Sequence, residues 1–282
     1  MCEKAQRIEA KDLPLPDMRD DLANALNPGA GEPVDPRELA RRDLVKSLPK
    51  RFYKQAATAA EGALFALVLD GRRALTPARN VLAVPSQTLA NWLAEEWNAQ
   101  TEYIDPGEMP LTRLINSAID SVSREMAATA AEIVKYAGSD LLCYRAAEPE
   151  NLVREQAAAW DPPLAWLHST FGARLALAEG IMFVEQPPEA LAAIAGAVNK
   201  AVGSHASAPL RVAAMNVMTT LSGSAVLAIA VAHRFLSTEQ AWQAAHVDED
   251  FQARFWGSDD EAIVRRARRW REMQGAARVL ES

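Results

Sequence analysis

The longest stretch without a charged residue, positions 212–232, constrains most strongly what this chain can fold into. Its 21 residues match the length that a bilayer requires of a spanning helix. However, the stretch contains asparagine, threonine, serine and glycine, and Arg211 and Arg234 lie close to its ends. We therefore expect no membrane insertion but a buried central helix at about 209–235, in which Gly223 lets another helix approach closely.

The composition also favours helices. Alanine supplies 55 of the 282 residues and aromatic residues only 6%, which suits helices packed through small side chains better than a β-sandwich. The net charge of −7 argues against general binding to nucleic acid or to an anionic membrane surface. Two cysteines, Cys2 and Cys143, are too few for a disulfide framework, so a reducing compartment is expected.

The first 45 residues form an arm in which acidic residues alternate with prolines. The segment has neither the apolar core of a secretory signal nor the arginine-rich, acid-poor character of a transit peptide. Because it offers little apolar surface to bury, we expect residues 1–45 to be disordered, and we assign them no role.

Residues 46–108 are predicted to form a β-rich domain with one helix. Asp70–Gly71 is a strong hairpin turn between the apolar run at 63–69 and a return strand at 72–77. Further strands are expected at 51–57 and 80–85. The period then changes, because four apolar residues fall on one helical stripe within 87–100. These four are Leu89, Trp92, Leu93 and Trp97.

Residues 109–282 are predicted to form a larger, all-helical domain, so the fold class is α+β with a boundary near 105–110. Asp161, Pro162 and Pro163 should divide one helical region into two helices. After the central helix, two helices should close the chain, each opened by a capping box. The expected helices span 111–122, 124–136, 151–160, 163–171, 189–202 and 209–235, and the two capping boxes pair Ser237 with Gln240 and Ser258 with Glu261.

Common catalytic motifs are absent from the sequence. It contains no phosphate-binding loop, dinucleotide fingerprint, zinc-protease helix or nucleophile elbow. The four histidines lack metal-ligand spacing, and Cys143 has no histidine nearby in the sequence to act as a base, so a structural cysteine is favoured. No metal and no cofactor is expected, and the balance shifts towards a binding protein.

Several longer strings together resemble one known family. They include RFYK at 51–54, EEWNAQ at 95–100, IDPGEMPLTRLINSAID at 104–120, SDLLCYRA at 139–146, TLSGSAVLAIAV at 220–231, EQAW at 239–242 and WGSDDEA at 256–262. In this order and spacing they resemble the assembly chaperones for the α subunit of the F-type ATP synthase, found in mitochondria and α-proteobacteria. The resemblance covers about residues 50–280.

The resemblance implies a protein that is not an enzyme. Such a chaperone would bind the unassembled ATP synthase α subunit, prevent its aggregation and release it to the β subunit. A small β-rich domain and a larger helical domain are implied, in agreement with the boundary above. Since no transit peptide is seen, we expect a bacterial cytoplasmic protein (mitochondrial matrix in a eukaryote) that is monomeric when free.

Two groups of residues are candidates for the work of such a protein. Acidic side chains beside an apolar anchor can stand in for charges that the client later meets. The candidates for client contact are Glu239, Asp248, Glu249 and Trp256. Other residues in the shared strings are expected to fix the domain junction or the local structure. They are Trp97, Asp105, Arg113, Asn116, Asp120, Asp140 and Arg145.

Two other functions remain open on sequence grounds. A small-molecule enzyme would use carboxylates in a cleft between the domains and predicts a carboxylate of raised pKa in a deep pocket. Its candidate residues are Asp105, Asp120, Asp140 and Asp161. A nucleic-acid-binding module would use the arginines around Trp270, but the net charge of −7 makes nucleic acid an unfavoured partner.

Overall fold

A computed structural model describes residues 48–180, 182–257 and 259–282 of the protein. Residues from Pro49 to Ser282 form one compact unit. The predicted arm, residues 1–45, lies outside the described residues. The division of the remainder into domains at 46–108 and 109–282 stays a prediction.

A small antiparallel sheet opens the described chain. Its strands are β1 (Ala56–Glu61), β2 (Leu64–Leu69), β3 (Arg72–Arg73) and β4 (Ala83–Val84). β2 is central, since β1 pairs with one of its edges and β3 and β4 with the other. Asp70 (φ 48°) and Gly71 (φ 80°) both occupy the left-handed region, so the predicted tight turn is confirmed.

The predicted edge strand at 51–57 is wrong in position, because β1 begins at Ala56. The carboxylate of Asp70 accepts hydrogen bonds from the backbone N–H groups of Lys54 and Gln55 at 2.9 Å each. Arg51 donates to the carbonyls of Tyr53 and Lys54. Side chains therefore bond the backbone that a strand ladder would have used.

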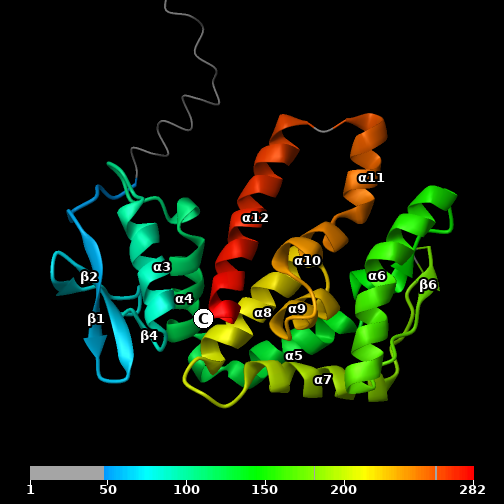
Figure 1. Ribbon diagram of the computed structural model, residues 1–282, viewed down its shortest axis with the longest axis horizontal. Helices are drawn as coiled ribbons and strands as arrows, with labels where there is room; N and C mark the ends of the chain where they lie inside the picture. The colour runs from blue at the N-terminus through cyan, green and yellow to red at the C-terminus, as the bar shows by residue number, and fades with distance from the viewer. Residues whose placement is uncertain (1–47, 181, 258) are drawn as a thin grey trace, which may run out of the picture. The chain divides into compact units, whose positions relative to one another are not determined.

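The predicted amphipathic helix is confirmed as α3 (Gln87–Asn98), capped by the Ser86 side chain. Its buried face includes Leu89 and Leu93 and packs against β1 and β2. At its C-terminal end, the Asn98 side chain bonds both the N–H and the C=O of Ala56. α3 is thus fixed to the sheet by apolar packing and by a paired amide contact (Figure 1).

The rest of the described chain is mainly helical. The helices are α4 (Pro110–Asp120), α5 (Met126–Ala137), α6 (Glu150–Phe171), α7 (Pro188–Val202), α8 (Ala208–Ser222), α9 (Ala225–Ala232), α10 (Thr238–Ala245), α11 (Val247–Trp256) and α12 (Asp260–Glu281). Single 3₁₀ turns lie at η1 (Pro106–Glu108), η2 (Val122–Arg124) and η3 (Leu141–Cys143), and β5 (Tyr144–Arg145) pairs in parallel with β6 (Ala178–Glu179). α12 packs against α4 and α8, and a fold of class α+β is confirmed (Figure 1).

The prediction of one long central helix at 209–235 is wrong. α8 ends at Ser222, Gly223 adopts a left-handed conformation (φ 70°), and Ser224 caps α9. Asp140 accepts hydrogen bonds from Ser224 Oγ and from the N–H of Val226, at the start of α9. The apolar character of the stretch was interpreted correctly, since every residue of α9 from Ala225 to Val231 is buried. No helix among the described residues is long and apolar enough to span a bilayer.

The prediction that Pro162 and Pro163 separate two helices is also wrong, because α6 continues through both. Two prolines inside a helix remove backbone donors and cost about 3 kcal/mol or more each. On the two sides of these prolines, Trp160 and Leu167 are fully buried, and Trp160 Nε1 donates to the carbonyl of Ala244 at 2.7 Å. Tertiary packing therefore holds the helix together where the local sequence favours a break.

Among the described residues, three helices, not two, follow α9. The predicted capping box of Ser237 and Gln240 at the start of α10 is confirmed. α11 was not predicted as a separate helix. Ser258 lies outside the described residues, and the side chain of Asp259 caps α12 by accepting from the N–H of Ala262 at 2.6 Å.

Candidate functional site

The strongest candidate site is a groove of about 740 Å³ between α11 and α12, which we call the α11–α12 groove. It is lined by His246, Glu249, Asp250, Gln252, Ala253, Trp256, Gly257, Asp259, Ala262, Ile263, Arg265, Arg266 and Arg269. The two helices are joined through Gly257, whose positive φ of 75° ends α11. α11 and α12 form a helical hairpin, and the C-terminus lies at the end of α12 that is farther from their connection (Figure 1).

Polar contacts hold α11 in place on both sides. Arg266 of α12 makes a bidentate ion pair with Asp250, and this pair holds the pKa of Asp250 below its ordinary value. On the other side, Arg254 contacts both carboxylate oxygens of Glu155 in α6. The Arg266–Asp250 pair joins two nitrogens to two oxygens, and such a bidentate pair fixes orientation as well as distance, so α11 has a defined placement against α12.

His246 forms the base of the groove, between α10 and α11. Its ring is buried, lies 4.0 Å from the ring of Trp242, and donates from Nδ1 to the Trp242 carbonyl at 2.7 Å. Burial lowers the pKa of His246, although the charge of Glu249 opposes that change. His246 therefore has a structural role between α10 and α11, and its Nε2 lies 3.8 Å from the Glu249 carboxylate.

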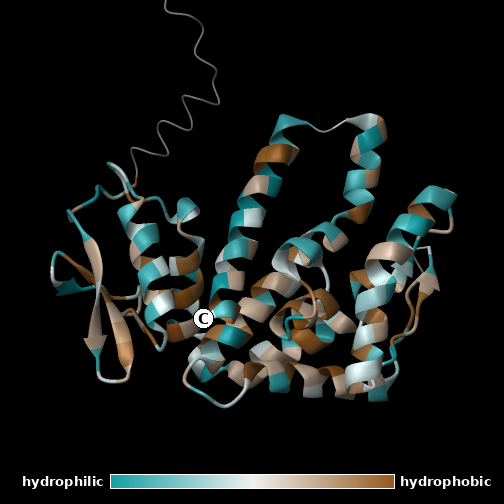
Figure 2. Ribbon diagram, viewed as in Figure 1, coloured by the Kyte–Doolittle hydropathy of each residue, from teal (hydrophilic) through white to brown (hydrophobic). Residues whose placement is uncertain are grey.

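The tip of this hairpin exposes large apolar side chains. Trp256 is 89% exposed, and Phe255, Ile263 and Val264 are also exposed. Figure 2 shows this hydrophobic turn at the start of α12, a helix that is otherwise largely hydrophilic. Apolar side chains bordered by charges are typical of a protein-binding surface, so the site is suited to reversible contact with another protein.

The predicted client-contact residues lie in three different settings. Glu249 and Trp256 line the α11–α12 groove. Asp248, one position earlier, accepts a 2.7 Å hydrogen bond from the buried Gln156 of α6. Glu239 is exposed in the first turn of α10 and is not among the residues that line the groove. The structure thus brings Glu249 and Trp256 together and ties Asp248 to the protein interior.

The predicted junction residues hold several separate contacts. Trp97 Nε1 donates to Thr112 Oγ1 at 3.0 Å, joining α3 to α4, and Arg113 pairs with Glu272 of α12 at 2.8 Å. Asp105 caps η1 through the N–H of Gly107. Asn116 has a buried Oδ1 without a hydrogen-bond partner in the part of the chain that is described.

Asp120 joins α4 to the turn after β3. Its carboxylate accepts hydrogen bonds from Thr76 Oγ1 at 2.6 Å, Asn80 Nδ2 at 2.8 Å and the N–H of Ala78 at 3.0 Å. These hydrogen bonds hold its pKa below the ordinary value, against a raising effect of burial. One carboxylate at the end of a helix therefore anchors the whole 76–80 turn.

Asp140, Cys143 and Arg145 lie around η3. Asp140 is fully buried, and desolvation raises its pKa to about 6. Burial, with the nearby charge of Asp140, raises the pKa of Cys143 to about 12, so the effect of Arg145 does not make it a reactive thiol. Arg145 lies over the Trp160 ring and pairs with Asp161 at 2.7 Å.

The known proteins that this chain resembles are chaperones. The family model described as "ATP12 chaperone protein" matches residues 50–168. The mitochondrial protein atp12 of Schizosaccharomyces pombe is 22% identical over 227 residues, covering 76% of this chain and 75% of that protein. The solved structure of Atp12 from Paracoccus denitrificans is 37% identical, with a TM-score of 0.73 over 83% of this chain and 97% of that chain. The chain belongs to the ATP12 chaperone family.

A second solved structure matches a larger part of this ATP12-family chain. The protein Atu1473 of Agrobacterium tumefaciens, described as a candidate chaperone, is 43% identical, with a TM-score of 0.78. The alignment covers 94% of this chain and 97% of that one. The resemblance seen in the sequence strings to a family of ATP synthase assembly chaperones is confirmed.

The carboxylates considered for an enzyme do not share one site in this ATP12-family chain. Each has its own partners: the N–H of Gly107 for Asp105, the 76–80 turn for Asp120, the start of α9 for Asp140, and Arg145 for Asp161. The one with the raised pKa is Asp140, which has no exposed surface. Within the described ranges, no group of three or more His, Cys, Asp or Glu side chains is arranged to hold a metal ion.

Sequence reasoning missed several residues of the site. Phe255, Ile263 and Val264 belong to the exposed tip, and Gln156 positions Asp248. The adjacent pair Ile263–Val264 was an available signal, because it lies in the charged run at 259–269, which offers no apolar stripe to bury it. No sequence signal joins Gln156 to Asp248, which are 92 positions apart.

Proposed function

We propose that this ATP12-family chaperone binds the unassembled α subunit of the F-type ATP synthase, prevents its aggregation and passes it to the β subunit. The observation that carries the proposal is the α11–α12 groove, which is lined by both the exposed Trp256 and Glu249. Membership of a family of ATP synthase assembly chaperones supports an ATP synthase subunit as the client. The α subunit as client, and the handover to the β subunit, are our inference.

The chemistry of the groove suits a chaperone that must release its client. Burying one large apolar side chain contributes about 1.5–3 kcal/mol before the entropy of association is subtracted. The exposed tip offers four such side chains: Phe255, Trp256, Ile263 and Val264. A patch of this size supports moderate affinity, which the native partner can exceed. Glu249 supplies a carboxylate for a basic or polar client surface.

We propose two further contacts with lesser roles. Glu239 is exposed in the first turn of α10 and is free to meet the client outside the groove. Asp248 acts by orienting the first turn of α11 through Gln156. The remaining sequence candidates, from Trp97 to Arg145, keep the structural role assigned to them above.

The test is light scattering of purified ATP synthase α subunit, diluted from denaturant with or without the chaperone. We expect suppression at a near-equimolar ratio and a co-eluting complex on size exclusion. Glu249→Lys and Trp256→Ser should each weaken protection, because both side chains line the groove. Glu102→Lys is the matched control, an exposed acid whose side chain makes no ion pair with any described residue.

Each outcome has a clear meaning. No suppression by the unaltered chaperone would refute the proposed client. Suppression that is equal in Glu249→Lys, Trp256→Ser and Glu102→Lys would keep the client but exclude the α11–α12 groove as its binding site. Circular dichroism of every variant shows that the fold is intact before protection is compared.

We also infer where and in what form the chaperone acts. The two bacterial relatives, at 43% and 37% identity, support a bacterial cytoplasmic protein. We propose that it is monomeric when free, has no catalytic activity and needs no cofactor. Protection of the client without added nucleotide or metal would support the last point.

A further inference from the structure

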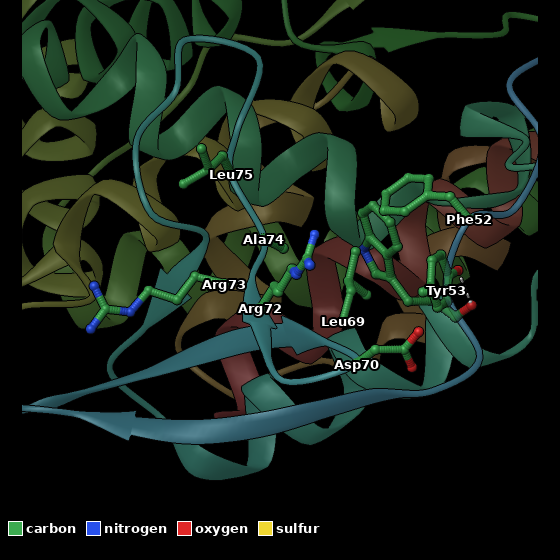
Figure 3. A pocket seen from close by; sticks show the side chains of 9 residues that line it. Phe52, Tyr53, Leu69, Asp70, Arg72, Arg73, Ala74 and Leu75 are labelled. Atoms are coloured by element: carbon green, nitrogen blue, oxygen red, sulfur yellow. Dashed lines mark hydrogen bonds between the residues drawn. The ribbon is translucent and has the colours of Figure 1, made fainter.

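A second groove lies at the opposite end of the described chain, against the β2–β3 hairpin. It has a volume of about 560 Å³, and we call it the hairpin groove. Its lining consists of Phe52, Tyr53, Leu69, Asp70, Arg72, Arg73, Ala74, Leu75 and Trp97. Figure 3 shows Arg72 between Phe52 and Tyr53 on one side and Arg73 and Leu75 on the other. None of these residues belongs to the α11–α12 groove.

Aromatic rings form one wall of the hairpin groove. Phe52 meets Tyr53 edge to face at 5.5 Å, and Tyr53 lies 5.5 Å from Trp97. Tyr53 is fixed because its hydroxyl donates to the Trp97 carbonyl at 2.6 Å. Phe52, at the open end of this row, is 73% exposed. Leu75, beyond Arg72, is 54% exposed, so large apolar side chains face solvent on both sides.

The charged residues of the hairpin groove differ in whether they are paired. Arg73 pairs with Glu61 at 3.0 Å. The Asp70 carboxylate accepts the N–H groups of Lys54 and Gln55, which hold its pKa below the ordinary value. Among the charged lining residues, only the Arg72 side chain has no hydrogen bond or ion pair to any described residue. Its guanidinium is thus available to a ligand.

The chain segment that supplies eight of the nine lining residues, all but Trp97, has the opposite charge to the protein as a whole. Residues 49–79 contain six basic and two acidic residues, a net charge of +4, whereas the chain carries −7. A basic region of this kind attracts acidic partners and repels basic ones. The complement of the hairpin groove is therefore a carboxylate flanked by apolar side chains.

We propose that the hairpin groove binds an extended acidic segment of a partner protein, with a carboxylate on Arg72 and neighbouring apolar side chains against Phe52 and Leu75. A guanidinium binds a carboxylate through two parallel hydrogen bonds. In an extended segment, alternate side chains point to opposite faces, which suits a trough with apolar residues on both sides of a charge. The proposal is independent of the client of the α11–α12 groove.

A protein segment fits better than a nucleic acid. A single-stranded nucleic acid needs several cationic groups along its backbone in addition to stacking rings. The hairpin groove offers one unpaired guanidinium. Binding to an oligonucleotide is therefore an outcome that the test must distinguish.

The test is isothermal titration of the full-length protein with a capped heptapeptide in which leucine alternates with aspartate. We expect saturable binding that weakens as salt is added. Arg72→Glu should weaken binding about tenfold or more, since a charge-assisted hydrogen bond is replaced by repulsion. Leu75→Ser should weaken it by a smaller factor. Neither change should alter the fold, because both side chains are exposed.

Three controls make the result decisive. Arg174→Glu makes the same charge change on an exposed arginine that lies outside the lining of the hairpin groove, and it should bind as the unaltered protein does. Peptides in which leucine alternates with lysine, or serine with aspartate, should bind more weakly. The proposal is overturned if the leucine–aspartate peptide does not bind, if Arg72→Glu and Arg174→Glu bind it equally, or if a thymidine oligonucleotide binds more tightly.

Discussion

Ser224 Oγ donates a 2.7 Å hydrogen bond to the carboxylate of Asp140, 84 positions earlier in the chain. The other carboxylate oxygen accepts from the N–H of Val226 at 3.1 Å, and the N–H of Leu141 donates to the carbonyl of Gly223. One buried carboxylate thus satisfies backbone donors that the break between α8 and α9 would leave unpaired. The break and the η3 segment therefore depend on each other.

Asp140 should make stability depend on pH. Burial raises its folded pKa from 3.8 to about 6, so between these values the folded protein keeps a proton that the unfolded chain has lost. The stabilising contribution of the protonated Asp140 is fully present below about pH 4 and is lost as the pH rises through about 6. The free energy of unfolding should fall by about 3 kcal/mol over this range because of this group.

The measurement is urea unfolding at pH 4.5 and pH 6.5. Asp140→Asn cannot titrate, so its stability should fall less between the two pH values than that of the unaltered protein. In Asp140→Asn, an NH2 group that cannot accept a hydrogen bond replaces one of the carboxylate oxygens that accept from backbone N–H groups. The variant should therefore also be less stable at both pH values by about 1–3 kcal/mol. An identical pH dependence in both proteins would show that Asp140 is not the titrating group.

Gln156 should matter more to stability than its polar character suggests. It is buried, accepts from the N–H of Ala146 at 2.8 Å and donates to Asp248 at 2.7 Å. Gln156→Ala leaves a backbone donor unpaired and should cost about 1–3 kcal/mol of unfolding free energy. Thermal unfolding followed by circular dichroism checks this value. Gln243→Ala, at an exposed site in α10, is the control, and equal melting temperatures for the two variants would contradict the assigned role.

Truncation of two tryptophans should change the stability of the protein by very different amounts. Trp160 is buried in α6 and bonds the carbonyl of Ala244, so Trp160→Ala should destabilise the protein by about 3–5 kcal/mol. Trp256 is 89% exposed, and Trp256→Ala should change stability by less than about 0.5 kcal/mol. Denaturant midpoints of the two variants test the contrast. A large loss in Trp256→Ala would mean that its side chain is packed, not available for contact.

Arg234 offers a stabilising change. It adopts a left-handed conformation (φ 60°) after α9, where the N–H of Phe235 bonds the carbonyl of Ala230. A residue with a side chain costs about 1 kcal/mol more than glycine in this region. Arg234 also lowers the pKa of Arg211 by repulsion, an effect second to burial. Arg234→Gly should therefore raise the melting temperature by about 2–4 °C, and an unchanged or lower value in calorimetry would refute this.

Local signals were sufficient for the elements with strong patterns. The hairpin at Asp70–Gly71, the stripe of α3 and the capping box of α10 were all predicted, because each depends on residues within a few positions of one another. The breaks were predicted poorly. Prolines in α6 lie within a continuous helix, and Gly223 ends a helix that composition alone would continue.

The candidate site was predicted in part. The sequence directed attention to Glu249 and Trp256, which line one groove in the structure. It did not distinguish Glu249 from Asp248, although the first faces the groove and the second faces Gln156. Adjacent residues on a helix point about 100° apart, so their partners depend on how the helix is placed against its neighbours.

By itself the sequence determined the class of the fold, the polarity of each region and the family, since these follow from composition, short-range pattern and specific strings. Only the tertiary structure decided where helices break and which carboxylates are buried, paired or exposed. Asp140 and Glu249 are both acidic residues, yet one lies in the core with a raised pKa and the other borders a groove. Their difference arises from partners distant in the chain, whose contacts and desolvation outweigh local preference.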